Sequence, residues 1–153
     1  DPIYQRPYWV NEHDTVGPQS IFLLKNGNPI LLDSTLMQAN GVVGNSKENL
    51  LFVADIGANK TYRYKINIEG ELESKTLFIE KGSDGMTLDA NGNLYLTGEG
   101  IDIYDRDGHF LQHIDIPEKW TANVCFGGEN FEYLFITASK SLYRVKTNVN
   151  SVR

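Results

Sequence analysis

The sequence predicts an all-β protein built from the blades of a β-propeller, and three observations support this prediction. Glycines are spread along the 153 residues, and turn dipeptides separate short apolar runs. Within these runs apolar and polar residues alternate with a period of two, which indicates strands. A strand-turn-strand pattern also repeats three times, at a spacing typical of four-stranded propeller blades, about 40 to 50 residues.

Turns and alternation place the individual strands. Three dipeptides that favour hairpins lie between apolar runs: Asn26-Gly27, Asn91-Gly92 and Asp107-Gly108. Alternation over 62–68 predicts a strand with one apolar face, made of Tyr62, Tyr64, Ile66 and Ile68. The segment 31–38 has apolar residues at helical spacing, but it is short and lies between Pro29 and Gly41. We interpret it as a strand end followed by a loop.

The three repeats begin at Asn40, Asp84 and Asn123, which are 44 and 39 residues apart. Each repeat is a strand, a tight turn and a second strand; two further strands are expected after the first two repeats, and one after the last. A partial blade at Ile21–Leu32 precedes them. At about 40 residues per blade the chain supplies fewer than four blades, whereas closed rings have typically 4 to 8.

We therefore interpret residues 1–153 as one partial propeller, the C-terminal half of a six-bladed ring of antiparallel sheets. Such an arc leaves strands unpaired at both ends. We expect an N-terminal half of the same propeller, or a second copy of the chain, as the partner.

Composition excludes several classes of partner. The net charge is −6, from 14 Lys and Arg against 20 Asp and Glu, with no basic cluster. Nucleic acid and anionic membrane are therefore poor candidates, and no run reaches the roughly 20 apolar residues of a membrane span. The single Cys125 allows no internal disulfide and no paired-thiolate zinc site. No signal peptide is visible from Asp1 on, so we expect a cytoplasmic protein, or a periplasmic or secreted one if an upstream signal was removed.

The residues that open the repeats are candidates for chemistry, because the first strand of a blade starts at the central channel. Asn40, Asp84 and Asn123 all carry side-chain oxygen. Oxygen ligands without thiolates or imidazoles suit a hard cation such as Ca²⁺ or Mg²⁺. The alternative is that these are ordinary turn residues, but Asn40 and Asp84 are expected before a strand rather than between two strands.

Other candidates are weaker. His109 and His113 lie about 13 Å apart in an extended strand, too far for one metal, so we expect solvated histidines. Ser83 is in no nucleophile-elbow motif. We expect Trp120 to pack between blades rather than line a pocket.

Several motifs, taken in order, resemble the calcium-dependent gluconolactonases of the SMP-30/regucalcin family, and together they cover essentially the whole chain. They are Asp1-Pro-Ile-Tyr4, Gln38-Ala-Asn-Gly41, Phe52-Val-Ala-Asp55, Gly82-Ser-Asp-Gly-Met86, Cys125-Phe-Gly-Gly128 and Leu134-Phe-Ile-Thr137. That family is a six-bladed propeller of about twice this length. The resemblance implies that Asn40 is a metal ligand and that Asp84 is a ligand and the catalytic base. The family's metal-binding Glu and its substrate-contacting Arg and Asn belong to the half without a counterpart here.

The resemblance implies a hydrolase that opens a sugar lactone or similar cyclic ester with a divalent metal, Ca²⁺ first and Zn²⁺ or Mg²⁺ as alternatives. The loops after the second strands are expected to bring Asp1, Asp55, Glu99 and Ser139 to the rim of the channel. The predicted channel-lining residues are Asp1, Tyr4, Asp55, Glu99 and Asn123. Two alternatives stay open. One is a non-catalytic propeller that serves as a binding platform or calcium-binding protein. The other is a strictosidine-synthase-like relative without the metal, which the presence of both Asn40 and Asp84 disfavours.

Overall fold

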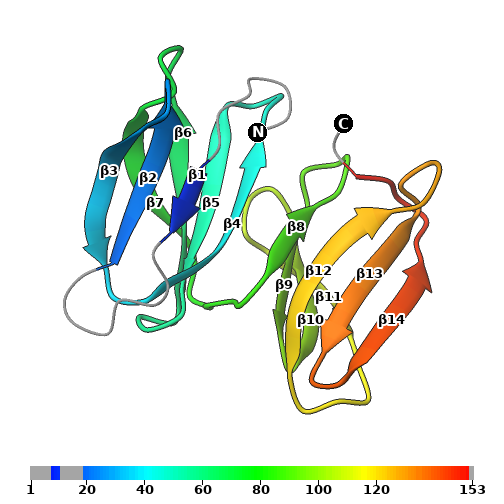
Figure 1. The fold of residues 1–153 in the computed structure, drawn as a ribbon. Helices are drawn as coiled ribbons and strands as arrows, with labels where there is room; N and C mark the ends of the chain where they lie inside the picture. The colour runs from blue at the N-terminus through cyan, green and yellow to red at the C-terminus, as the bar shows by residue number, and fades with distance from the viewer. Residues whose placement is uncertain (1–7, 11–18, 152–153) are drawn as a thin grey trace. The chain divides into compact units, whose positions relative to one another are not determined.

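The computed structural model describes residues 8–10 and 19–151, and all their regular elements are β-strands (Figure 1). The chain divides after Gly82 into two compact units. Each unit holds one three-stranded and one four-stranded antiparallel sheet, with neighbouring strands consecutive in sequence. This organisation confirms the predicted propeller blades, two complete and two incomplete. Among the described residues there is no helix long and apolar enough to cross a bilayer.

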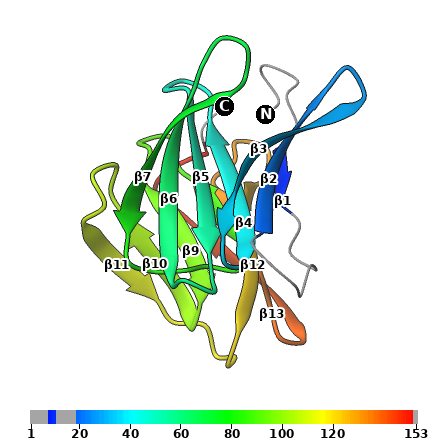
Figure 2. The same ribbon diagram turned by 90° about the vertical axis from the view of Figure 1, so that its left-hand side faces the viewer.

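The first unit contains the sheets β1-β2-β3 and β4-β5-β6-β7, and Figure 2 shows β4 to β7 side by side. The strand bounds are β1 (Tyr8–Val10), β2 (Gln19–Lys25), β3 (Asn28–Leu36), β4 (Ala39–Asn45), β5 (Leu50–Asp55), β6 (Lys60–Ile66) and β7 (Leu72–Ile79). The segment 31–38 is the end of β3 and a two-residue connection, as expected.

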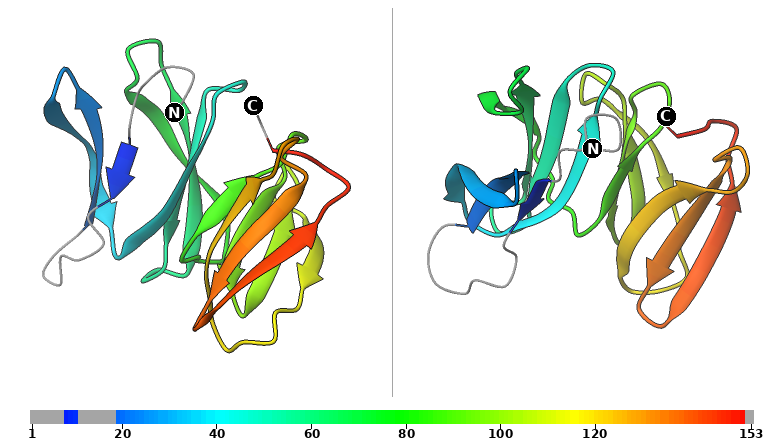
Figure 3. Two further views of the ribbon diagram at one scale, coloured as in Figure 1. Left: turned by 45° about the vertical axis from the view of Figure 1, so that its right-hand side comes forward. Right: turned by 45° about the horizontal axis from the view of Figure 1, so that its top comes forward.

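The second unit contains the sheets β8-β9-β10-β11 and β12-β13-β14, seen from two further sides in Figure 3. The bounds are β8 (Met86–Leu88), β9 (Leu94–Gly98), β10 (Gly100–Tyr104), β11 (Phe110–Ile114), β12 (Thr121–Gly127), β13 (Tyr133–Ala138) and β14 (Ser141–Lys146). The three repeats are the pairs β4–β5, β8–β9 and β12–β13.

All three dipeptides lie in hairpin turns. Asn26 and Gly27 both have positive φ, 54° and 79°, which is the two-residue turn that this dipeptide favours. Asp89 and Asp105 organise the other two turns, because one carboxylate oxygen of each accepts backbone N–H bonds from the residues two and four positions later. Gly92 and Gly108 supply the positive φ that these loops require.

Each unit has its own core between its two sheets. In the first unit the fully buried residues include Ile21, Leu36, Val53 and Tyr64. In the second unit the core is Tyr95, Ile101, Ile103, Val124, Phe126, Leu134 and Ile136, and the Tyr95 and Phe126 rings meet edge to face at 5.4 Å. Each such large apolar side chain contributes about 1.5–3 kcal/mol when buried.

Two details of the predicted strands were wrong. Ile68 lies beyond the end of β6 and is 84% exposed, because the chain turns through Asn67–Gly70 and β7 pairs only as far as Ile66. Asn40 lies inside β4 rather than before it, and Asn123, which opens the third repeat, lies inside β12. Both are at register shifts of the first strand pair, where a bulge can redirect a side chain. Only Asp84 precedes its strand.

Candidate functional site

Asp84 is a partly buried carboxylate in the loop that leads into β8. Its Oδ2 accepts a 2.8 Å hydrogen bond from the indole Nε1 of Trp120, the residue directly before β12. Ser139, after β13, donates its backbone N–H to the Trp120 carbonyl at 2.9 Å and so fixes the main chain there. The indole is 42% exposed. The expectation that Trp120 only packs between blades therefore missed its polar contact with Asp84.

Two buried hydroxyls hold the loop that carries Asp84. Ser83 and Thr97 are each 1% exposed. The backbone N–H of Gly85 donates to Thr97 Oγ1 at 2.8 Å, and the N–H of Thr97 donates to Ser83 Oγ at 2.9 Å. The two hydroxyls have the carbonyls of Gly85, Thr97 and Ala122 as acceptors. Ser83 thus positions its neighbour, and the sequence-based rejection of it as a nucleophile agrees with its burial.

Gly85 brings the loop of Asp84 against Asn123. A Cβ on Gly85 would lie 2.7 Å from Asn123 Cα, closer than real Cβ atoms approach other heavy atoms. Asn123 is exposed, and its Oδ1 accepts the backbone N–H of Val124 at 2.8 Å. Within the second unit, the residue that follows Asp84 therefore lies directly against Asn123. The channel-lining role of Asn123 stays a prediction.

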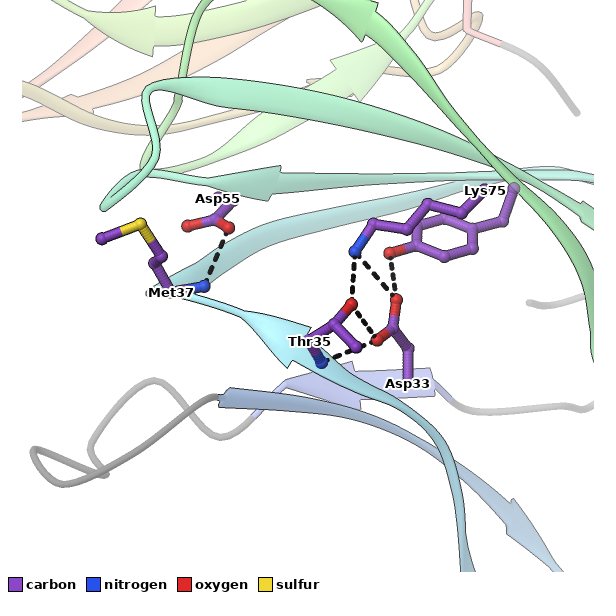
Figure 4. A network of polar contacts seen from close by, with 6 residues as sticks. Asp33, Thr35, Met37, Asp55 and Lys75 are labelled. Carbon is purple, nitrogen blue, oxygen red and sulfur yellow. Dashed lines mark hydrogen bonds and ion pairs between the residues drawn. The ribbon is translucent and has the colours of Figure 1, made fainter.

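Asn40 lies in the first unit as the second residue of β4 and is partly buried. The connection before it is fixed by Asp55 at the end of β5. The Asp55 carboxylate accepts the N–H groups of Met37 and Gln38, each at 2.9 Å, and that of Ala58 at 3.1 Å; Figure 4 shows the bond from Met37. Asp55 is 1% exposed. Asp55 thus holds the backbone of the β3–β4 connection and of the turn after β5. Its channel-lining role stays a prediction.

The remaining predicted residues are distributed differently. Glu99 is exposed between β9 and β10. Asp1 and Tyr4 lie outside the described residues. The predicted ligand roles of Asn40 and Asp84 stay predictions.

A polar network around Asp33 joins the two sheets of the first unit (Figure 4). Asp33 Oδ2 accepts the hydroxyl of Tyr64 at 2.7 Å and lies 3.1 Å from Lys75 Nζ, while Thr35 donates to Oδ1. Burial raises the pKa of Asp33, but the hydrogen bonds from Thr35, Tyr64 and Lys75 outweigh it, so the pKa lies below its ordinary value. Burial, reinforced by Asp33, raises the pKa of Tyr64. Tyr64 is therefore a neutral donor that ties the sheets together.

Two histidines lie in the described part of the chain, and both are on the β10–β11 hairpin. His109 is exposed and pairs with Asp105 in the turn at 3.1 Å. His113 is exposed on β11, as expected, and it also pairs through Nδ1 with Asp102, which is 9% exposed. Asp105, Asp107 and His109 have ligand-capable atoms within 4.8 Å of one another. The hydrogen bonds of the turn account for this grouping.

Comparison with known proteins identifies the family. Residues 9–140 match the family model of the SMP-30/Gluconolactonase/LRE-like region, so the chain belongs to that family. The gluconolactonase of Zymomonas mobilis is 31% identical over 140 residues, which are 82% of this chain and 39% of that protein. The pentonolactonase of Haloferax volcanii is 26% identical over 82% of this chain and 46% of its own length.

The fold has a close structural counterpart. The calcium-binding protein regucalcin from Agrobacterium tumefaciens superimposes with a TM-score of 0.78 over 90% of this chain and 57% of its own, at 21% identity. This likeness shows the shared propeller fold. The chain spans less than half the length of the two curated lactonases.

Proposed function

We propose that the protein, when its propeller is complete, is a metal-dependent hydrolase that opens a sugar lactone of the gluconolactone type or a similar cyclic ester. Its membership of a family that includes lactonases supports this class of substrate. The observation that carries the proposal is the set of hydrogen bonds that hold Asp84 and its loop. Its loop is fixed by two buried hydroxyls, and its carboxylate is oriented by one indole donor.

Asp84 is the proposed catalytic base. Its carboxylate would accept a proton from the water that attacks the lactone carbonyl, a role that contributes typically 10²- to 10⁴-fold in rate. Trp120 holds Oδ2, so the orientation of the carboxylate is set before substrate binds. Oδ1 has no hydrogen-bond donor among the residues that the structure describes and is available for the reaction.

The chemistry of the donor set fits a hard divalent cation, Ca²⁺ first, with Mg²⁺ or Zn²⁺ as alternatives. Asn40 and Asp84 are the proposed ligands, and both offer oxygen, as Ca²⁺ prefers. The cation would supply Lewis-acid polarisation of the carbonyl. Because Ca²⁺ takes six to eight oxygens, two protein ligands are too few for tight binding. We expect calorimetry on the 153 residues alone to show weak Ca²⁺ binding or none.

We further propose that the partner of this chain is the N-terminal half of the same propeller rather than a second copy, and that the protein acts in the cytoplasm. The competing function is a non-catalytic platform or calcium-binding protein. That alternative stays open because only two metal ligands are proposed in this chain, and because the same propeller fold serves many activities.

Hydrolysis of gluconolactone by the complete protein separates these functions. The rate is measured after treatment with chelator and again after addition of Ca²⁺, Mg²⁺ or Zn²⁺. Turnover that is lost with chelator and regained with one cation is the expected result. Turnover that is indifferent to chelator would contradict the metal, and no turnover with any cation, despite tight Ca²⁺ binding, would favour the non-catalytic alternative.

A further inference from the structure

The indole of Trp120 presents an exposed apolar surface beside Asp84. The residue is 42% exposed, although its one polar side-chain atom, Nε1, is bonded to Asp84 Oδ2 at 2.8 Å. The exposed part of the side chain is therefore mostly carbon. Among the residues that the structure describes, no aromatic ring stacks on the indole and no cation lies over it. Asp84 thus occupies the edge of the ring and leaves its faces for another contact.

The chain on both sides of the indole is held in place. Ser139 donates its backbone N–H to the Trp120 carbonyl at 2.9 Å, and Glu118 accepts the hydroxyl of Ser141 at 2.7 Å. The next residue, Thr121, is fully buried and begins β12. An aromatic side chain that is already held in place loses little conformational freedom when a ligand covers it, which favours binding.

Exposure alone does not single out an aromatic residue, because scattered exposed apolar side chains are common. Two other aromatic residues are exposed in the described part of the chain, Phe110 at 57% and Phe131 at 40%. The ring of Phe110 meets that of Tyr104 edge to face at 5.7 Å. Phe131 lies in the β12–β13 turn, at the opposite end of β12 from Trp120. Trp120 differs from both because it contacts a carboxylate of the candidate site.

The geometry of the hydrogen bond limits what can lie on the indole. The N–H group is in the plane of the ring, so the carboxylate of Asp84 lies at the ring edge and a ligand on a ring face lies beside it. A quaternary ammonium ion is typically bound in a cage of several aromatic rings, and the described residues place no second ring on this one.

A saturated sugar ring suits the indole and the carboxylate together. One face of such a ring carries C–H groups that can cover the apolar surface of an aromatic side chain. Its hydroxyl groups lie at the edge and can donate to Asp84 Oδ1. A small-molecule site commonly combines an apolar wall with a few polar groups that orient the ligand.

We propose that the exposed face of Trp120 binds the ring of the substrate, with a C–H face of that ring against the indole and the ester group towards Asp84. This role rests on the proposed lactonase function, and it narrows the substrate class to lactones with a saturated, carbohydrate-type ring. Trp120 then has two separate roles. Its N–H edge orients the catalytic base, and its face binds substrate.

Two substitutions separate these roles in the complete protein. Trp120→Phe and Trp120→Leu both remove the N–H donor, but only phenylalanine keeps a flat aromatic face. With gluconolactone at saturating metal, kcat should fall about tenfold in both variants. KM should be at least about fivefold higher in Trp120→Leu than in Trp120→Phe, because only the leucine variant loses the stacked face. A residue that only orients Asp84 would give the two variants the same KM.

Phe131→Leu is the matched control. It replaces an aromatic residue of similar exposure by leucine at the other end of β12. Its kcat and KM should both stay within about twofold of wild type. Thermal unfolding of the three variants verifies that each one is folded.

Binding of a sugar ring without an ester bond tests the Trp120 face independently of turnover. The probe is methyl glucoside, which has a saturated six-membered ring and is not a lactone. Saturation-transfer NMR should show contact of its ring C–H protons with wild type and with Trp120→Phe, and affinity for Trp120→Leu should be at least about fivefold weaker. The fluorescence of Trp120, measured as the difference between wild type and Trp120→Phe, should change as the probe binds.

The outcomes distinguish this role from the proposed function. Equal KM values and equal probe affinities of the two Trp120 variants, in a protein that hydrolyses gluconolactone, would overturn the substrate-binding role and leave the lactonase intact. Probe binding that requires the aromatic face, in a protein that hydrolyses no lactone, would support sugar binding at Trp120 and contradict the lactonase. If the leucine variant does not fold, wild type still gives the answer, because unchanged Trp120 fluorescence up to about 100 mM probe would overturn the role.

Discussion

The indole of Trp120 and the carboxylate of Asp84 are joined by a 2.8 Å hydrogen bond although they lie 36 residues apart in sequence. The bond connects the loops that precede β8 and β12, the first strands of two successive blades. It occupies one carboxylate oxygen and thereby fixes the direction of the other.

Trp120→Phe in the complete protein should lower kcat about tenfold and weaken metal binding. The substitution keeps an aromatic ring but removes the donor, and hydrogen bonds to charged groups contribute about 1.5–3 kcal/mol. Lactone turnover and metal titration measure the two effects. A variant with wild-type kcat and metal affinity would show that the indole does not orient Asp84.

Gly85→Ala should destabilise the protein by about 1–3 kcal/mol, because the new Cβ would overlap Asn123 and force the loop of Asp84 away from β12. Gly98→Ala is the matched control, since a Cβ there meets nothing within 4 Å. Chemical denaturation measures both. Equal stabilities of the two variants would contradict the close approach of Gly85 to Asn123.

Thr97→Val should cost about 1–3 kcal/mol of stability, because the buried N–H of Gly85 loses its acceptor while the side-chain volume is kept. Thr137→Val, at the corresponding exposed position of the next repeat, should change stability by less than about 0.5 kcal/mol. Urea denaturation of the two variants gives the comparison. If Thr97→Val is as stable as Thr137→Val, the buried hydroxyl does not hold the loop of Asp84.

The ionisation of Asp33 makes the stability of the fold depend on pH in the acidic range. Its pKa in the folded protein is below the ordinary value, so the ionised carboxylate stabilises the fold above the unfolded-state pKa of about 4. That stability is lost as the pH falls from about 4 through the lower folded pKa. Asp33→Asn should be less stable than wild type at pH 7, and the difference should shrink below pH 4. A difference that is constant from pH 7 to pH 3 would contradict this account.

Local patterns predicted most of the fold. Asn26-Gly27 needs only two residues with positive φ, and the alternation in β14 involves only its own six residues. The repeats predicted three strand pairs because each pair is formed within one short segment. The end of β6 was missed at Ile68, because alternation continues past the residue where pairing with β7 stops.

The contacts of the candidate site were less predictable because they join distant segments. Trp120 gave no local sign of its bond to Asp84, and Asp33 meets Tyr64 across 31 residues. One signal was available at Thr97, a polar residue after the apolar run Leu94-Tyr-Leu96 in a buried strand. A hydroxyl at such a position needs a partner, and here the partner is the loop of Asp84.

The most direct test of the central claim is the kcat of Asp84→Asn on gluconolactone in the complete protein at saturating metal. The substitution keeps the size and one oxygen while removing the charge and the basicity. If Asp84 is both ligand and base, kcat should fall by about 10²- to 10⁴-fold. Metal affinity should also fall, and the thermal stability without metal should be nearly unchanged. Asn91→Asp, in the β8–β9 turn, is the control and should be silent. Activity of Asp84→Asn within about threefold of wild type would remove Asp84 from the mechanism and favour the non-catalytic alternative.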